Sequence, residues 1–455
     1  MLSGLAALYR PAPAIAPLPK AEVPLKYRLC RWQMMASAFW GYAGFYIVRQ
    51  NFSLAKPYLI HERHLTNGDV GLIATALALA YGVSKFVMGN LSDRSNPRFF
   101  MATGLIVSGT INIFFGRLSS VGAMAFWWFM NGWFQGMGWA PCARTLTHWF
   151  SDRERGTKFA IWNTAHNVGG GIAAPIINLS ISVFGVWTCA FYAPGAIAIL
   201  IGLLILVFLR DTPQSVGLPP IEEFKDDYPE TGVTDREQEL SAKDRLFKFV
   251  LNNRVLWILA FANAFVYVVR YGVLNWAPTY LNAVKGSSHA LARWQYFAFE
   301  YAGIPGTLLA GWLSDRFFRG RRGPVSLIYM AVVFAAVVVY WRNPAGHAWL
   351  DATALALIGF LIYGPVMLIG VAAVDCVPKK AAGTAAGFTG FFGYVFGATI
   401  AELGIGKVVD RWGWNAGFFI VLGSCALASL LLALTWNAHD RGARGRSPHD
   451  APIRT

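Results

Sequence analysis

The stretch Trp40–Leu59, WGYAGFYIVRQNFSLAKPYL, decides how the rest of the sequence is interpreted. It lies in a hydrophobic, aromatic window of about residues 32–60, which is longer than the roughly 20 residues that cross a bilayer as a helix. Arg49 stands inside this window, eighteen residues after Arg31 and therefore roughly 27 Å further along a helix axis. An arginine at that depth costs at least about 2.5 kcal/mol, so we expect it to have a partner of opposite charge.

The composition predicts an all-α polytopic membrane protein. Of the 455 residues, 55% are hydrophobic and 14% are charged, whereas a soluble domain carries about 25% charged residues. One long polar stretch, 210–249, separates two groups of apolar windows. These windows predict twelve transmembrane helices in two pseudo-symmetric six-helix bundles, over residues 32–60, 68–91, 98–118, 121–146, 157–185, 188–209, 253–283, 291–313, 324–342, 349–376, 382–408 and 414–437.

The loop charges predict the orientation and the domains. The net charge is +15, and the basic residues gather in alternate loops between the hydrophobic windows, which argues against a nucleic-acid partner and places those loops in the cytoplasm. Both termini and the central loop should therefore be cytoplasmic. We expect a cytoplasmic N-terminal segment (1–31), an N-terminal bundle (32–209), a cytoplasmic central loop (210–252), a C-terminal bundle (253–437) and a cytoplasmic tail (438–455).

No enzyme signature is found. The chain has no G-x-x-x-x-G-K-[ST] phosphate loop, and the segment His61-Glu62-Arg63-His64 lacks the H-E-x-x-H spacing of a zinc protease. The five cysteines are scattered, which predicts neither a disulfide framework nor a metal cluster. We therefore expect no enzymatic activity, no cofactor and no metal.

The two halves repeat their motifs. Tyr46-Ile-Val-Arg49 returns 221 residues later as Tyr267-Val-Val-Arg270, and Gly89-Asn-Leu-Ser-Asp-Arg94 returns as Gly311-Trp-Leu-Ser-Asp-Arg316. Corresponding motifs in two six-helix halves predict a transporter whose site lies between the halves, near the middle of the membrane. The acidic and basic ends of the second motif, at cytoplasmic helix ends, predict a conformational latch rather than a ligand contact, formed by Asp93, Arg94, Asp315 and Arg316.

Arg49 and Arg270 occupy equivalent places in the two halves, and we expect both to bind one anion. The planar guanidinium fork matches phosphate oxygens bidentately, so two forks suit a doubly charged anion. The alternative is that buried acids neutralise the arginines. Acids of the first half fall only in loops or at helix ends: Glu62, Asp69, Asp93, Asp152 and Glu154. In the second half Glu300, Glu402 or Asp375 could reach Arg270, and Glu300 and Glu402 also keep a proton-coupled mechanism open.

Other polar side chains are candidates for substrate binding. His166 shares a helix face with Trp162 and Asn163, and an imidazole near two arginines could donate to a phosphate. Lys85 either contributes to the site or extends its ammonium to the cytoplasmic end of its helix. Phenols could hydrogen-bond an anion or a hydroxylated substrate, although packing is the alternative role of each; the candidates are Tyr42, Tyr46, Tyr267, Tyr363 and Tyr394.

Several stretches resemble the organophosphate:phosphate antiporters of the major facilitator superfamily. They include YIVRQNFSLAKPYL, YGVSKFVMGNLSDRSNPR, NTAHNVGGG, FVYVVRYG and KKAAGTAAGFTGFFGY, and the match extends over nearly the whole chain. The resemblance implies that Arg49 and Arg270 bind the phosphate beside His166. It also implies that Lys85, Tyr267, Tyr363 and Tyr394 lie in or near the substrate path.

The implied activity is import of glycerol-3-phosphate in exchange for internal inorganic phosphate, across the bacterial inner membrane. We expect the protein to be a monomer. Gln50, where the family often has lysine, and Glu402 depart from the family pattern and bear on which substrate is preferred. The alternatives are a hexose-phosphate or other organophosphate antiporter, or a membrane sensor of sugar phosphates.

Overall fold

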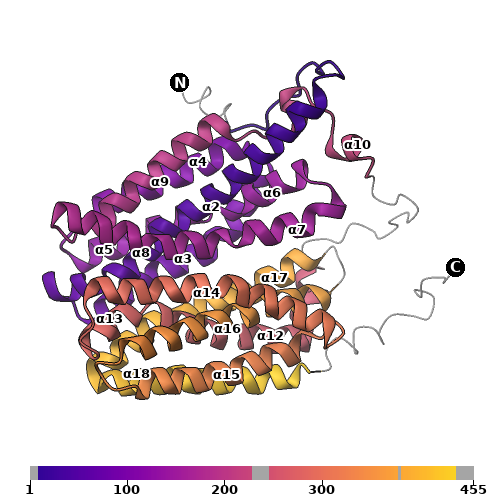
Figure 1. Ribbon diagram of the computed structural model, residues 1–455. Helices are drawn as coiled ribbons and strands as arrows, with labels where there is room; N and C mark the ends of the chain where they lie inside the picture. The colour runs from indigo at the N-terminus through magenta and orange to yellow at the C-terminus, as the bar shows by residue number, and fades with distance from the viewer. Residues whose placement is uncertain (1–8, 228–244, 378–380, 437–455) are drawn as a thin grey trace. The chain divides into compact units, whose positions relative to one another are not determined.

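The structure, a computed structural model, describes residues 9–227, 245–377 and 381–436, and every regular element in these ranges is a helix (Figure 1). The helices before the central loop are α2 (Val23–Glu62), α3 (Asn67–Asp93), α4 (Pro97–Phe115), α5 (Val121–Gln135), α6 (Trp139–Trp149), α7 (Asp152–Asn163), α8 (Ala165–Phe184) and α9 (Cys189–Phe208). The short helices η1 (Pro213–Val216) and α10 (Ile221–Lys225) follow.

The second half of the chain begins with the π-helix η2 (Arg245–Leu251). Then come α12 (Arg254–Leu274), α13 (Ala277–Ala283), α14 (His289–Arg316), α15 (Arg322–Arg342), α16 (Ala348–Asp375) and α17 (Ala382–Phe391). Two π-helical stretches, η4 (Phe392–Ala398) and η5 (Ile400–Gly404), lead into α18 (Ile405–Leu434).

The chain divides into two compact units. Unit 1 comprises Met1–His64 and Ala76–Arg236, and unit 2 comprises Leu65–Thr75 and Glu237–Thr455. In unit 1, α2 packs against α8 and α9, and α4 packs against α9; in unit 2, α16 packs against α14 and α15, and α12 against α18. The boundaries expected for the five segments stay a prediction, and much of the central loop and all of the tail lie outside the described residues.

Each of the twelve predicted spans falls on helix in the described part of the chain, but several are interrupted. The span 121–146 is divided between α5 and α6, 157–185 between α7 and α8, and 253–283 between α12 and α13. The eleventh and twelfth spans share α18, inside which Gly413 has a φ of 77° and separates two helical parts. The first helix also begins earlier than the predicted residue 32, at Val23.

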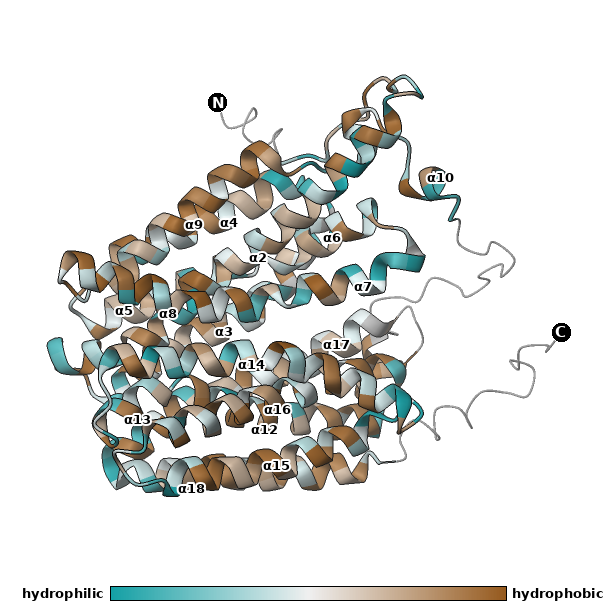
Figure 2. Cartoon of the chain, viewed as in Figure 1, coloured by the Kyte–Doolittle hydropathy of each residue, from teal (hydrophilic) through white to brown (hydrophobic). Residues whose placement is uncertain are grey.

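Hydropathy along the helices is that of a membrane protein. Figure 2 shows long hydrophobic stretches on helices such as α9, with hydrophilic residues gathered near α7 and α10. Seven helical stretches of the described chain are long and apolar enough to cross a membrane, and one of them, Gly383–Leu434, has 52 residues and thus room for two passages. α2 and α14 are not among the seven, and these helices carry the buried charged residues Arg49, Lys56 and Glu300.

Glycines bring α14 and α16 into backbone contact. A Cβ atom on Gly306 of α14 would lie 1.6 Å from the carbonyl oxygen of Phe360. A Cβ on Gly359 of α16 would lie 2.1 Å from the carbonyl oxygen of Phe299. Small residues permit such close approach between membrane helices, where packing rather than the hydrophobic effect drives association.

We expect Gly306→Ala to lower the free energy of unfolding by about 2 kcal/mol. The added methyl group would overlap backbone atoms of the neighbouring helix, which can shift only at a cost in packing. Thermal unfolding of the purified protein in detergent measures the change. Gly370→Ala on α16 is the matched control, since a Cβ there meets no atom within 4 Å and alanine favours the helix. Equal stability of the two variants would contradict the contact.

Candidate functional site

In unit 1, Arg49 of α2 is buried, with 7% of its surface exposed, between aromatic rings. Its guanidinium carbon lies 4.3 Å from the centroid of the Tyr81 ring of α3 and 5.3 Å from that of Tyr46, one turn earlier on α2. A guanidinium over a ring face is attracted by the ring quadrupole, and the attraction grows when water is excluded. The rings therefore stabilise the cation inside the bundle.

A series of contacts among rings and a second cation begins and ends at this arginine. The Lys85 ammonium lies 5.9 Å from the Tyr81 ring and 5.8 Å from the Trp139 ring. Trp139 in turn contacts Trp162 with ring centroids 6.3 Å apart. Trp162 lies 4.8 Å from Tyr42, which lies 5.4 Å from Tyr46 and so returns to Arg49. Unit 1 thus brings Arg49, Lys85, Tyr42, Tyr46 and Trp162 into one group, the Arg49 cluster.

His166 joins this cluster through the break between α7 and α8. Its ring centroid lies 5.5 Å from that of Tyr46, and its Nδ1 hydrogen-bonds the backbone carbonyl of Asn163. Because a carbonyl only accepts, Nδ1 carries the proton, and Nε2 of the neutral ring is an acceptor. Asn163 therefore orients His166 through its backbone. On protonation the imidazole would present a second N–H donor.

In unit 2, Arg270 of α12 is 3% exposed and lies among three tyrosine rings. Its guanidinium carbon is 4.5 Å from the centroid of Tyr363, 4.9 Å from that of Tyr271 and 5.8 Å from that of Tyr267. Tyr394 of η4 lies 5.2 Å from Tyr267, ring to ring. This group, the Arg270 cluster, contains the second-half residues that the sequence predicted.

Glu300 reaches Arg270 through Tyr363. Nη2 of Arg270 donates to the Tyr363 hydroxyl at 3.3 Å, and that hydroxyl donates to Oε2 of Glu300 at 2.5 Å. Glu300 is 1% exposed. The other two candidate acids have different partners: Glu402 accepts from Asn275 at 2.5 Å, and Asp375 lies 3.6 Å from Arg322.

Sequence reasoning missed Tyr81, Trp139 and Tyr271. Tyr81 stands four residues before Lys85, and Tyr271 stands four after Tyr267, so helical spacing placed both near chosen candidates. Trp139 offered no such signal, because it reaches the cluster from α6.

The predicted latch residues are found at helix ends. Asp315 forms an ion pair of 2.5 Å with Arg322, whereas Arg94 and Arg316 are exposed. The side chain of Asp93 lies outside the described ones. The latch role of all four stays a prediction.

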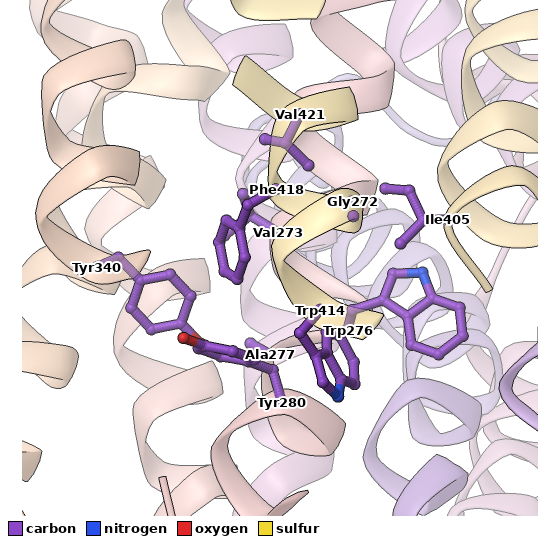
Figure 3. A pocket seen from close by; sticks show the side chains of 11 residues that line it. Gly272, Val273, Trp276, Ala277, Tyr280, Tyr340, Ile405, Trp414, Phe418 and Val421 are labelled. Carbon is purple, nitrogen blue, oxygen red and sulfur yellow. The ribbon is translucent and has the colours of Figure 1, made fainter. Parts of the chain in front are cut away.

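Unit 2 also contains a pocket between α12, α13, α15 and α18 (Figure 3). Aromatic rings such as Trp276, Tyr280, Tyr340 and Phe418 form its wall, and none of its lining residues is charged. A pocket without a cation cannot neutralise a phosphate group, so this pocket is not the candidate anion site.

The long apolar helices define a multi-pass membrane protein. The chain belongs to the Major Facilitator Superfamily, whose family model matches residues 38–402. It is 55% identical to the glycerol-3-phosphate transporter of Bacillus subtilis, with 95% of this chain and 98% of that protein covered. It is 45% identical to a probable hexose phosphate transport protein of Chlamydia pneumoniae, with 93% and 95% covered.

A solved structure has the same fold. A bacterial homologue of the human lysosomal transporter Spinster, in an inward-facing and unoccupied conformation, matches with a TM-score of 0.70 at 17% identity. The match covers 92% of this chain and 99% of that one. Together with the family match, this makes the protein a membrane transporter with the major facilitator fold.

Proposed function

We propose that the protein imports glycerol-3-phosphate in exchange for internal inorganic phosphate. It does so across the bacterial cytoplasmic membrane, as a monomer with both termini in the cytoplasm. The similarity to the glycerol-3-phosphate transporter of Bacillus subtilis supports an organophosphate substrate. The observation that carries the proposal is the pair of buried arginines, Arg49 and Arg270, which stand at repeat positions and lie each among tyrosines in its own unit.

In the proposed site, the two guanidinium groups bind the phosphoryl oxygens. Each fork makes two parallel charge-assisted hydrogen bonds, which are about twice as strong as neutral ones. We infer from the sequence repeat that both arginines bind the same anion. The ring contacts described for each arginine lie within its own unit. The remaining proposed substrate-binding residues are Lys85, His166, Tyr42, Tyr46, Tyr267, Tyr363, Tyr394, Trp162 and Asn163.

Aromatic rings stabilise the buried arginine of each unit, and in unit 2 a tyrosine also links the arginine to a carboxylate. In unit 2 the Tyr363 hydroxyl donates a hydrogen bond to Glu300, and its oxygen accepts one from Arg270. A buried carboxylate one hydroxyl away from Arg270 lowers the net positive charge of this cluster. In unit 1 the ring faces of Tyr46 and Tyr81 stabilise the Arg49 cation.

Exchange follows from the cost of burying charge. Closing the cavity around two cations without an anion removes them from water, and the desolvation penalty of a buried ion is several kcal/mol. A bound phosphate group offsets that charge and allows the units to change access from one side to the other. An anion therefore has to accompany each transition, in each direction.

A hexose phosphate is the second candidate substrate, because the probable hexose phosphate transport protein of Chlamydia pneumoniae is also similar to this chain. Both substrates share the phosphoryl group that the arginines would bind. The two substrates differ in the hydroxylated carbon skeleton that the tyrosines would contact. The arginines would therefore bind either substrate.

Counterflow in proteoliposomes tests the proposal. Vesicles loaded with phosphate should accumulate labelled glycerol-3-phosphate faster than glucose-6-phosphate, and vesicles without protein should accumulate neither. Preference for glucose-6-phosphate would replace the substrate while retaining the exchange. Binding of an organophosphate without any flux would instead favour a sensor.

A further inference from the structure

Three fully buried asparagines tie α2 to its neighbouring helices beside Arg49. Asn112 of α4 and Asn131 of α5 both donate from Nδ2 to the carbonyl oxygen of Val48, each at 3.0 Å. Asn51 of α2 donates to Oδ1 of Asn112 at 2.8 Å and to the carbonyl oxygen of Ala190 in α9 at 2.9 Å. Each of the three asparagines is 0% exposed. Helices α4, α5 and α9 thereby hold α2 on both sides of residue 49 in the sequence.

These bonds fix the height and rotation of α2. A buried amide without a partner costs roughly 2–7 kcal/mol, so sliding α2 against its neighbours would leave several such groups unpaired. The Val48 carbonyl is also the regular acceptor for the Phe52 N–H in an α-helix, so side chains join a bond that already exists. One residue of slip would move Arg49 by 1.5 Å along the axis and by about 100° around it.

The asparagine bonds come from other helices than the rings that face the guanidinium. The Asn bonds involve α4, α5 and α9, whereas the guanidinium lies over the rings of Tyr46 and Tyr81. Fixing the backbone at residue 48 therefore fixes where the guanidinium of the next residue is presented. Bidentate recognition is sensitive to such placement, since sites need their groups held within about 0.5 Å and 10–20°.

We propose that Asn112 and Asn131 are positioning residues for Arg49 in anion binding. They touch no substrate and act by holding the Val48 carbonyl. This inference rests on the proposed function, because it assumes that Arg49 binds phosphate.

The test measures the Kd of inorganic phosphate for the purified full-length protein by tryptophan fluorescence. Asn131→Leu keeps the number and branching of the side-chain heavy atoms but removes the donor, and it should weaken phosphate binding about tenfold. Asn112→Leu should do the same by removing the second donor to the same carbonyl. In an Arg49→Lys background, Asn131→Leu should weaken binding no further, because a point charge no longer depends on fork geometry. Phosphate can be titrated to high concentration, so weak binding stays measurable.

The matched control is Asn343→Leu in unit 2, outside both arginine clusters. Asn343 is also a buried asparagine, and its Nδ2 donates to Oδ1 of Asp351 at 2.8 Å. It should lower the melting temperature while leaving the Kd of phosphate within about twofold of the original. An unchanged Kd in folded Asn131→Leu and Asn112→Leu, or an equal loss in both Arg49 backgrounds, would overturn the positioning role. Absence of phosphate binding by the unmodified protein would refute the proposed function instead.

Discussion

The variants Arg49→Lys and Arg270→Lys should each reduce the rate of phosphate exchange by at least about 100-fold. Lysine keeps the positive charge, but its ammonium is a point charge on a flexible stem and cannot form the two parallel bonds of a guanidinium fork. It is also more strongly hydrated, so enclosing it in a dry site costs more. The rate of labelled phosphate exchange in proteoliposomes measures the loss.

Arg342→Lys is the matched control for these two variants. The Arg342 guanidinium lies 4.4 Å from the ring centroid of Trp341, so the change alters a cation over an aromatic ring outside both arginine clusters. Exchange by this variant should stay close to that of the unmodified protein. Unimpaired exchange in Arg49→Lys or Arg270→Lys would remove that arginine from the proposed anion site.

Vesicles that contain no phosphate or other exchangeable anion should take up glycerol-3-phosphate at no more than about 1% of the exchange rate. Return of the empty transporter would require two arginines to be enclosed without a counter-charge, and a barrier raised by roughly 3 kcal/mol already slows a step about 100-fold. Initial uptake with and without internal phosphate, at the same membrane potential, measures the ratio.

The control for this experiment adds phosphate to the same vesicles by freeze–thaw and follows the recovery of uptake. Fast uptake before the phosphate is added would contradict obligatory exchange. It would leave the assignment of organophosphate transport intact, since only the coupling would be wrong.

The sequence predicted the helices well because membrane-spanning apolar windows are long and uniform. It did not predict the breaks. The residues Asn275 and Trp276 separate α12 from α13 just before Pro278, whose missing N–H could have indicated an interruption. The break at Thr164 has neither glycine nor proline beside it, so no local signal was present.

The contacts of the candidate site were predictable from the sequence where both residues lie on the same helix. Tyr46 with Arg49 and Tyr267 with Arg270 are one turn apart, and their contacts appear in the structure as helical spacing requires. Contacts between helices were not predictable in this way. The sequence left three acids open as partners of Arg270, and only the packing of α14 against α16 brings Glu300 to it through Tyr363.

The glycine contacts of α14 and α16 have a mechanical consequence. Phe299, which meets Gly359, immediately precedes Glu300, and Gly359 stands one turn before Tyr363. Two helices whose backbones are in contact at such points move as one rigid body and do not slide past each other. Glu300 and Tyr363, the acid and the phenol beside Arg270, would thus move together through the transport cycle.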